Sequence, residues 1–120
     1  MATTLTVVCV EGEAPAGFDL PGVVLAGPTG LTVGFTSVAD ALAAARRLMA
    51  AAAHEGRAPS VGIDVGDVDP ERAADAAAVA RAAELCAEAG AGRTLVTDRV
   101  RLLAGGDAAL SPLAGAPGVY

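Results

Sequence analysis

The chain has 120 residues, of which 53% are hydrophobic and 2% aromatic, and its formal net charge is −6 at pH 7. A chain of this length can bury a core without metals or disulfides, so we expect a single domain spanning residues 1–120. Only eight residues are basic, which excludes a positively charged surface for nucleic acid. The uncharged apolar runs are too short to cross a membrane, and the beginning of the chain lacks the pattern of a secretory leader. We therefore expect a cytoplasmic protein.

The two cysteines, Cys9 and Cys86, are far apart in the sequence. Neither belongs to a Cys-x-x-Cys pair, and neither is close in sequence to His54, the only histidine. A structural zinc site requires three or four nitrogen or sulfur ligands. The pattern therefore favours two buried thiols over a zinc or redox site, and we expect no metal and no cofactor.

The first predicted elements are strands. Residues 4–10 are rich in β-branched side chains, which is typical of a strand. Residues 14–21 contain two prolines and a glycine, so we expect a connector rather than a packed helix. The short apolar runs 23–26 and 31–35 are separated by Gly-Pro-Thr-Gly at 27–30, which predicts an antiparallel hairpin.

A helix is predicted after the hairpin. Ser37 is a suitable N-cap, with the carboxylate of Asp40 at the third helical position. The helix is expected to continue to Glu55 and to end at Gly56. Residues 60–66 alternate between apolar and other side chains, which predicts the next strand.

A second helix is predicted from Pro70 to about Ala89. Asp69 is its expected N-cap, and proline is favoured at the first helical position. Its apolar side chains recur at the spacing of a half-buried helix, which predicts that Cys86 lies in the core. The side chains expected on the buried side are Val79, Ala82, Ala83 and Cys86, and those expected on the opposite side are Arg81, Glu84 and Glu88.

The last predicted elements are a strand at residues 93–97, a short helix capped by Asp98 and ending at Leu103, and a closing edge strand at Val119–Tyr120. Together the elements predict the α/β class, specifically an α+β sandwich in which helices pack on a largely antiparallel sheet.

Five segments, in the correct order, resemble the catalytic domain of class III nucleotidyl cyclases, which include the adenylate and guanylate cyclases. Residues 62–68, Gly-Ile-Asp-Val-Gly-Asp-Val, resemble the family's Gly-Ile-His-x-Gly-Glu-Val strand and turn. Residues 79–85 are similar to Val-Asn-x-Ala-Ala-Arg-Leu, and residues 92–97 are similar to Gly-x-x-Leu-Val-Ser. Upstream, residues 30–42 resemble the second metal strand and the Ser-x-x-Asp-Ala-Leu helix start, and residues 6–12 resemble the first strand.

The resemblance implies a ferredoxin-like, nucleotidyl-cyclase-like fold that is shortened. The family has two helices between its first and second strands, whereas this chain has only residues 13–21 there. Loss of that helical layer would leave part of one sheet face uncovered, and soluble monomers rarely expose several hundred Å² of contiguous apolar surface. We therefore expect a homodimer, or docking of another protein, on that face.

The resemblance also implies that the catalytic residues of the family are replaced. The two metal-binding aspartates correspond to Cys9 and Thr29, whose side chains are poor ligands for Mg²⁺. The ribose-positioning asparagine corresponds to Ala80, and the phosphate-binding arginine to Glu84, which reverses the charge.

The two residues that select the base are replaced as well, by Leu25 and, at about the later position, Ala73. Loss of one electrostatic contributor in such a site typically costs about two to three decades in rate. The sequence therefore predicts a degenerate pseudo-enzyme with no catalytic, cofactor-binding or metal-binding residues.

Other motifs favour structural interpretations. Asp64, Asp67 and Asp69 do not have the spacing of a calcium loop, and are predicted to be a strand residue, a turn residue and a helix cap. Residues 27–30 are predicted to be a turn rather than a phosphate loop, because no helix follows them. His54 suits an exposed position at a helix end.

Three functions remain open from the sequence. The first is a non-catalytic cyclase-homology module in bacterial signalling or regulation, acting by self-association or through a regulatory partner. The second is a receptor for a small molecule or nucleotide in the remnant cleft, and the third is residual cyclase activity. The arginine pairs Arg46–Arg47 and Arg99 with Arg101 are predicted to be solvated or to donate salt bridges rather than to bind an acidic ligand.

Overall fold

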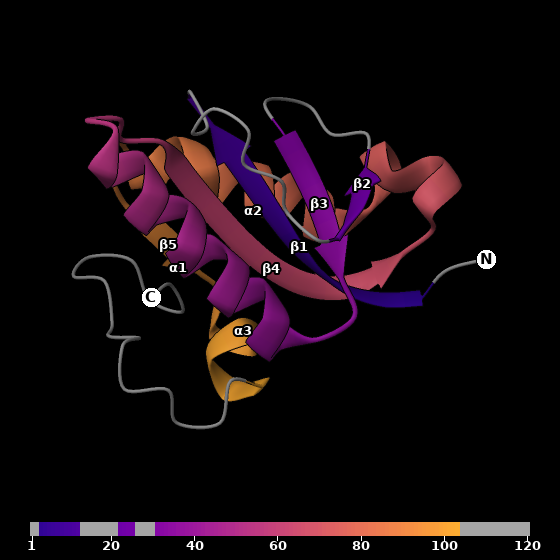
Figure 1. The fold of residues 1–120 in the computed structure, drawn as a ribbon. Coiled ribbons are helices and arrows are strands. Elements are labelled where there is room, and N and C mark those ends of the chain that lie inside the picture. Colours follow the sequence, from indigo (N-terminus) through magenta and orange to yellow (C-terminus); the bar gives the residue numbers. More distant parts are fainter. Residues whose placement is uncertain (1–2, 13–21, 26–30, 104–120) are drawn as a thin grey trace.

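The computed structural model describes residues 3–12, 22–25 and 31–103, which form a five-stranded sheet with helices on both faces (Figure 1). The elements in chain order are β1 (Thr3–Glu11), β2 (Val23–Leu25), β3 (Leu31–Phe35), α1 (Val38–His54), β4 (Ser60–Val68), the 3-10 helix η1 (Pro70–Asp75), α2 (Ala77–Ala89), β5 (Thr94–Val96) and α3 (Asp98–Leu103). The turn predicted at residues 27–30 and the strand predicted at Val119–Tyr120 lie outside the described residues.

The strand order is β2-β3-β1-β4-β5, and every pair is antiparallel except β4 and β5. This confirms the predicted class, a largely antiparallel sheet with helices packed on it. The parallel pair follows from the connection through η1 and α2, since parallel strands require a long crossover.

Alternation along the central strand β1 divides the core into two layers. Val8 and Val10 belong to the layer that includes α1 and α3, whereas Val7 and Cys9 belong to the layer under α2. A strand directs successive side chains to opposite faces, and β1 is buried on both.

The helix α1 begins where the sequence predicts. The amide of Asp40 donates a hydrogen bond to the side-chain oxygen of Ser37 at 3.3 Å, which satisfies one of the free amides of the first turn. The chain leaves the helix at Gly56, which has a positive φ of 72°. The buried side of α1 packs on β1, β3 and β4 through Leu42, Ala44, Ala45 and Leu48.

The predicted single helix from Pro70 to Ala89 is wrong in one respect, because it is broken at Ala76. Ala76 has extended backbone angles, φ −76° and ψ 135°, between η1 and α2. Ala73 and Ala78 are both buried against the sheet side. In a continuous helix residues five positions apart point in different directions, so the break allows both side chains to reach the core.

The short helix α3 also differs from the prediction, in the residue that caps its N-terminus. Asp98 is its first residue rather than its cap, and the hydroxyl of Thr97 accepts a hydrogen bond from the amide of Val100 at 3.4 Å. None of the helices in the described part of the chain is long and apolar enough to cross a membrane.

Candidate functional site

Three positions that the sequence resemblance matched with functional residues of cyclases lie in the core. Cys9, Leu25 and Ala73 are at most 5% exposed and belong to one hydrophobic cluster beneath α2 and η1. In the closed structure, a side chain in this cluster is shielded from solvent and from a substrate. Thr29, the fourth such position, lies outside the described residues.

The remaining two positions, Ala80 and Glu84, are exposed one turn apart on α2. Glu84 accepts a hydrogen bond from the guanidinium of Arg81 at 3.1 Å. Both positions line a groove of about 530 Å³ between α2 and the junction of β5 with α3. The structure therefore does not bring the five described positions together as one site: two line a groove and three are packed inside.

A buried carboxylate lies beside this groove. Asp64 is fully buried on β4, and its two oxygens accept hydrogen bonds from the Thr97 hydroxyl at 2.7 Å and from the Arg99 guanidinium at 2.8 Å. The Arg99 side chain is otherwise 62% exposed and lines the groove together with Thr97. Asp64 thereby fixes an arginine at the surface, which is the salt-bridge alternative of the two that the sequence left open, although the sequence did not identify the partner.

The three aspartates of the possible calcium loop have separate roles. Asp67 accepts a hydrogen bond from the hydroxyl of Thr4 at 2.8 Å, and Asp69 accepts one from the amide of Glu71 at 3.1 Å, as the predicted cap. Within residues 3–12, 22–25 and 31–103, no three His, Cys, Asp or Glu side chains are grouped so that they could hold a metal ion. Asp64 is a strand residue and Asp69 a helix cap, as predicted, but the predicted turn residue Asp67 lies within β4, opposite Thr4.

The second candidate surface is the β2 side of the sheet, on the face that carries α1. Val24 is 72% exposed and Leu31 is 39% exposed, and both lie on this face because they alternate in register with Val33. A side-chain carbon added at Gly22 would contact Val33 and the ring of Phe35, so the chain itself lies over part of the face.

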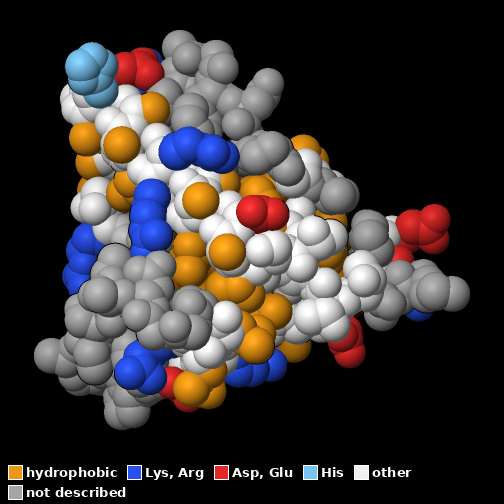
Figure 2. All heavy atoms as spheres, turned by 60° about the horizontal axis from the view of Figure 1, so that its bottom comes forward, with side chains coloured by type: hydrophobic (Ala, Val, Ile, Leu, Met, Phe, Trp, Pro, Cys, Tyr) orange, Lys and Arg blue, Asp and Glu red, His pale blue; other side chains and the backbone are white. Residues whose placement is uncertain are grey.

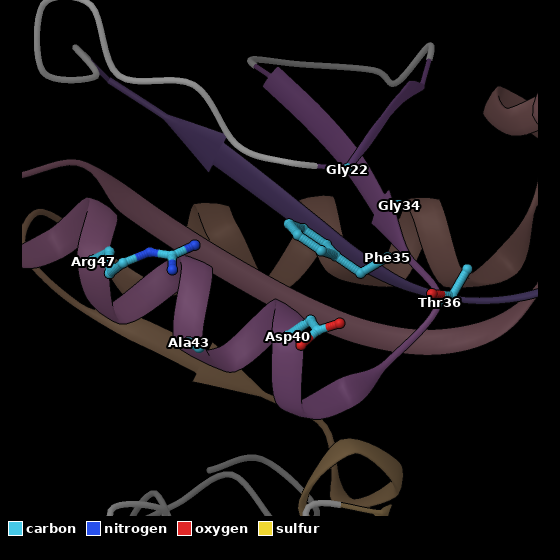
Figure 3. A pocket seen from close by; sticks show the side chains of 7 residues that line it. All are labelled: Gly22, Gly34, Phe35, Thr36, Asp40, Ala43 and Arg47. Carbon is cyan, nitrogen blue, oxygen red and sulfur yellow. The ribbon is translucent and has the colours of Figure 1, made fainter.

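A cavity of about 560 Å³ adjoins this face between β3 and α1 (Figure 3). The ring of Phe35 lies between the two elements, and the side chain of Arg47 extends from α1 towards it. Asp40 and Ala43 line the same cavity from the first turns of α1. We call Val24, Leu31 and the cavity residues Phe35, Asp40, Ala43 and Arg47 the β2–α1 surface. Figure 2 shows acidic and arginine side chains with hydrophobic side chains between them on the α1 side of the molecule.

The two cysteines, which the sequence placed separately in the core, are neighbours. Both are fully buried, and the thiol of Cys86 donates a hydrogen bond to the carbonyl oxygen of Ser60 at 3.2 Å. The hydrogen bond between the Cys86 and Cys9 side chains, together with burial, raises the pKa of the Cys86 thiol far above its ordinary value. Periodicity predicted that Cys86 is buried, but it contains no information on which strand residue it meets.

Comparison with solved structures gives a fold relationship. The chain is similar to the crystal structure of an adenylate/guanylate cyclase/hydrolase from Silicibacter pomeroyi, with a TM-score of 0.73 and 16% sequence identity. The similarity covers 99% of this chain and 94% of that chain. No protein-family model matches the chain, and no curated protein matches it. At this identity the comparison supports a cyclase-like fold and nothing finer.

Proposed function

We propose that this chain is a non-catalytic, degenerate cyclase-like module that works by association with protein, either a second copy of itself or a regulatory partner. The burial of Cys9, Leu25 and Ala73 supports the non-catalytic part. Even an aspartate at position 9 would be a buried charge next to a thiol rather than an open metal ligand, because Cys9 is fully buried.

The proposed association with protein rests on the exposed apolar edge of the sheet. Val24 and Leu31 are exposed on β2 and β3, and β2 is an edge strand of the described sheet. An edge strand presents backbone donors and acceptors to another chain, and exposed apolar side chains beside it add area that association would bury. Nothing comparable supports catalysis.

The charges of the β2–α1 surface favour self-association. Asp40, Ala43 and Arg47 are exposed on α1 at the spacing i, i+3 and i+7, so they follow one stripe of the helix. In a two-fold dimer each contact occurs twice, with residue i meeting j and j meeting i. Antiparallel packing of two α1 helices about Ala43 would set Asp40 of each copy against Arg47 of the other.

The proposal is tested by sedimentation velocity over a range of concentrations. Val24→Lys should raise the dissociation constant of the dimer by about tenfold or more, because it places a charge in an apolar contact. Leu102→Lys is the matched control: Leu102 is also a large exposed hydrophobic residue, 65% exposed, but lies on α3. Equal effects of the two substitutions, or a monomeric wild-type chain, would count against association through the β2–α1 surface.

A second function rests on the groove beside α2. Ala80 and Glu84, which correspond to the asparagine and arginine of the family, line the same groove as Arg99. A receptor would bind a small molecule in this remnant cleft without catalysing a reaction on it. A thermal-shift series with nucleotides, nucleosides and apolar metabolites tests it: a ligand that raises the melting temperature of the wild type but not of Ala80→Trp, which fills the groove, would favour this function over the first.

Catalysis is tested separately, by incubating the chain with ATP or GTP and Mg²⁺ or Mn²⁺. We expect no cyclic nucleotide above the level of a heat-denatured control, because no family metal ligand is retained at the described positions. Turnover that increases with protein concentration would contradict the non-catalytic proposal and leave the association measurement unaffected.

A further inference from the structure

The two cysteines meet where α2 approaches the sheet most closely. Cys9 is paired with Gly62 across β1 and β4, and both lie on the face under α2. A side-chain carbon at Gly62 would overlap the backbone of α2, at the carbonyl oxygen of Ala82 and the amide of Cys86. The missing side chain of Gly62 therefore lets the helix backbone lie directly on β4, which brings Cys86 to Cys9.

The contact is specific in its chemistry as well as its position. Both thiols are fully buried, and they belong to the same cluster of the core. Thr32 is paired with Cys9 across β1 and β3, and its buried hydroxyl oxygen has no hydrogen-bond partner among the described residues. A buried hydroxyl without a partner is costly, and this one belongs to the residue opposite Cys9 in the strand register.

We propose that Cys9 and Cys86 form a modification site, at which hydrogen peroxide converts the two thiols into an intrachain disulfide that joins β1 to α2. This inference is independent of the association proposed above. It concerns residues inside the core rather than the β2–α1 surface.

The reaction balances in two steps. The Cys9 thiolate attacks one oxygen of the peroxide, a sulfur–oxygen bond forms, the oxygen–oxygen bond breaks, and hydroxide leaves; the product is a sulfenic acid at Cys9. The Cys86 sulfur then attacks the Cys9 sulfur, the sulfur–sulfur bond forms, and hydroxide leaves with the Cys86 proton as water. The two thiols lose two electrons in total, and one peroxide becomes two water molecules.

The surroundings assign the order of the two sulfurs. The thiol of Cys86 donates its proton to the carbonyl oxygen of Ser60, which holds that proton on the Cys86 sulfur, so we assign the first attack to Cys9. The side chain of Thr32 lies on the same face as Cys9, where its oxygen can accept a hydrogen bond from the O–H of the sulfenic acid. Because both thiols are buried, peroxide reaches them when α2 opens locally, and the reaction is slower than at an exposed cysteine.

The experiment treats the purified full chain with hydrogen peroxide, then denatures it and alkylates the remaining thiols. We expect both thiols to disappear together, with an intact mass lower by two hydrogen atoms and reversal by dithiothreitol. Trypsin should release the peptide 82–93 linked to the peptide that contains Cys9. The oxidised chain should melt about 10 °C higher than the reduced chain, because the cross-link closes a long loop.

Single variants test the order of attack. In Cys86→Ala the sulfenic acid at Cys9 should persist and be trapped by dimedone, whereas Cys9→Ala should give much less adduct. The wild-type chain alone suffices to overturn the proposal. Three outcomes would overturn it. One is that both thiols can still be alkylated after a treatment that fully oxidises glutathione. The others are a chain that gains oxygen atoms, and disulfide-linked dimers in place of the internal cross-link.

Discussion

Replacing Gly62 by alanine should destabilise the chain far more than the same replacement at Gly66, four residues along β4. The new carbon at Gly62 would overlap backbone atoms of Ala82 and Cys86, and backbone cannot rotate away as a side chain can. At Gly66 it would meet only the side-chain carbon of Ala78, at 3.2 Å. Both glycines lack positive φ, so the comparison isolates helix packing.

The magnitude follows from the buried side of α2. Its six buried residues, Ala78, Val79, Ala82, Leu85, Cys86 and Ala89, contribute roughly 7 kcal/mol of apolar transfer free energy. Lifting the helix by about 0.5–1 Å forfeits about a quarter to a half of close-packing attraction. We therefore expect Gly62→Ala to lower the free energy of unfolding by about 2–4 kcal/mol, and Gly66→Ala to change it by less than about 1 kcal/mol.

The assay is urea unfolding followed by far-ultraviolet circular dichroism, with the slope on urea checked for each variant. A melting temperature about 10 °C lower for Gly62→Ala, with little change for Gly66→Ala, is the expected thermal counterpart. If the two variants were equally stable, α2 would not lie directly on β4, and the placement of Cys86 beside the sheet would be wrong.

Three further predictions concern charges. Arg99→Ala leaves the buried Asp64 carboxylate with one hydroxyl partner and should lower the free energy of unfolding by about 3 kcal/mol. Asp64→Asn frees an exposed guanidinium to be hydrated and should lower the free energy of unfolding by about 1 kcal/mol. Equal losses of stability in urea unfolding would contradict this. The raised pKa of the Cys86 thiol means that above about pH 8.5 the unfolded chain loses a proton that the folded chain keeps. The free energy of unfolding should therefore fall by up to about 1.4 kcal/mol per pH unit in that range. The same dependence of stability on pH in Cys86→Ala would refute this. Arg47→Glu and Asp40→Lys should each weaken the dimer, because each places like charges opposite one another. An equimolar mixture of the two chains should restore the dimer by pairing opposite charges. If the mixture dimerises no more strongly than either variant alone in sedimentation, the two-fold contact is excluded.

The sequence predicted the order and type of most elements because local rules determine them. The cap at Ser37 and the end of α1 at Gly56 depend on hydrogen bonds and backbone angles within one turn. The sequence missed the break at Ala76, since alanine favours a continuous helix there and only packing of two distant faces against the sheet requires the break. The N-cap of α3 was predicted at Asp98, one residue after its position at Thr97.

The candidate sites were less predictable because they depend on contacts between distant segments. The resemblance to cyclases indicated which side chains were replaced, but not that Cys9 and Leu25 are core residues while Ala80 lines a groove. The pairing of Asp64 with Arg99 joins residues 35 positions apart. Alternation and periodicity predict which face a side chain occupies, and they do not predict its partner on that face.

The central claim, that the chain associates and does not turn over nucleotide, is tested most directly by sedimentation velocity of the wild-type chain across a wide concentration range, with and without ATP, GTP and Mg²⁺. The account predicts a monomer–dimer equilibrium that shifts with protein concentration and is indifferent to nucleotide. A chain that stays monomeric at every concentration and changes its sedimentation only when nucleotide is present would contradict it and favour a receptor that uses the groove beside α2.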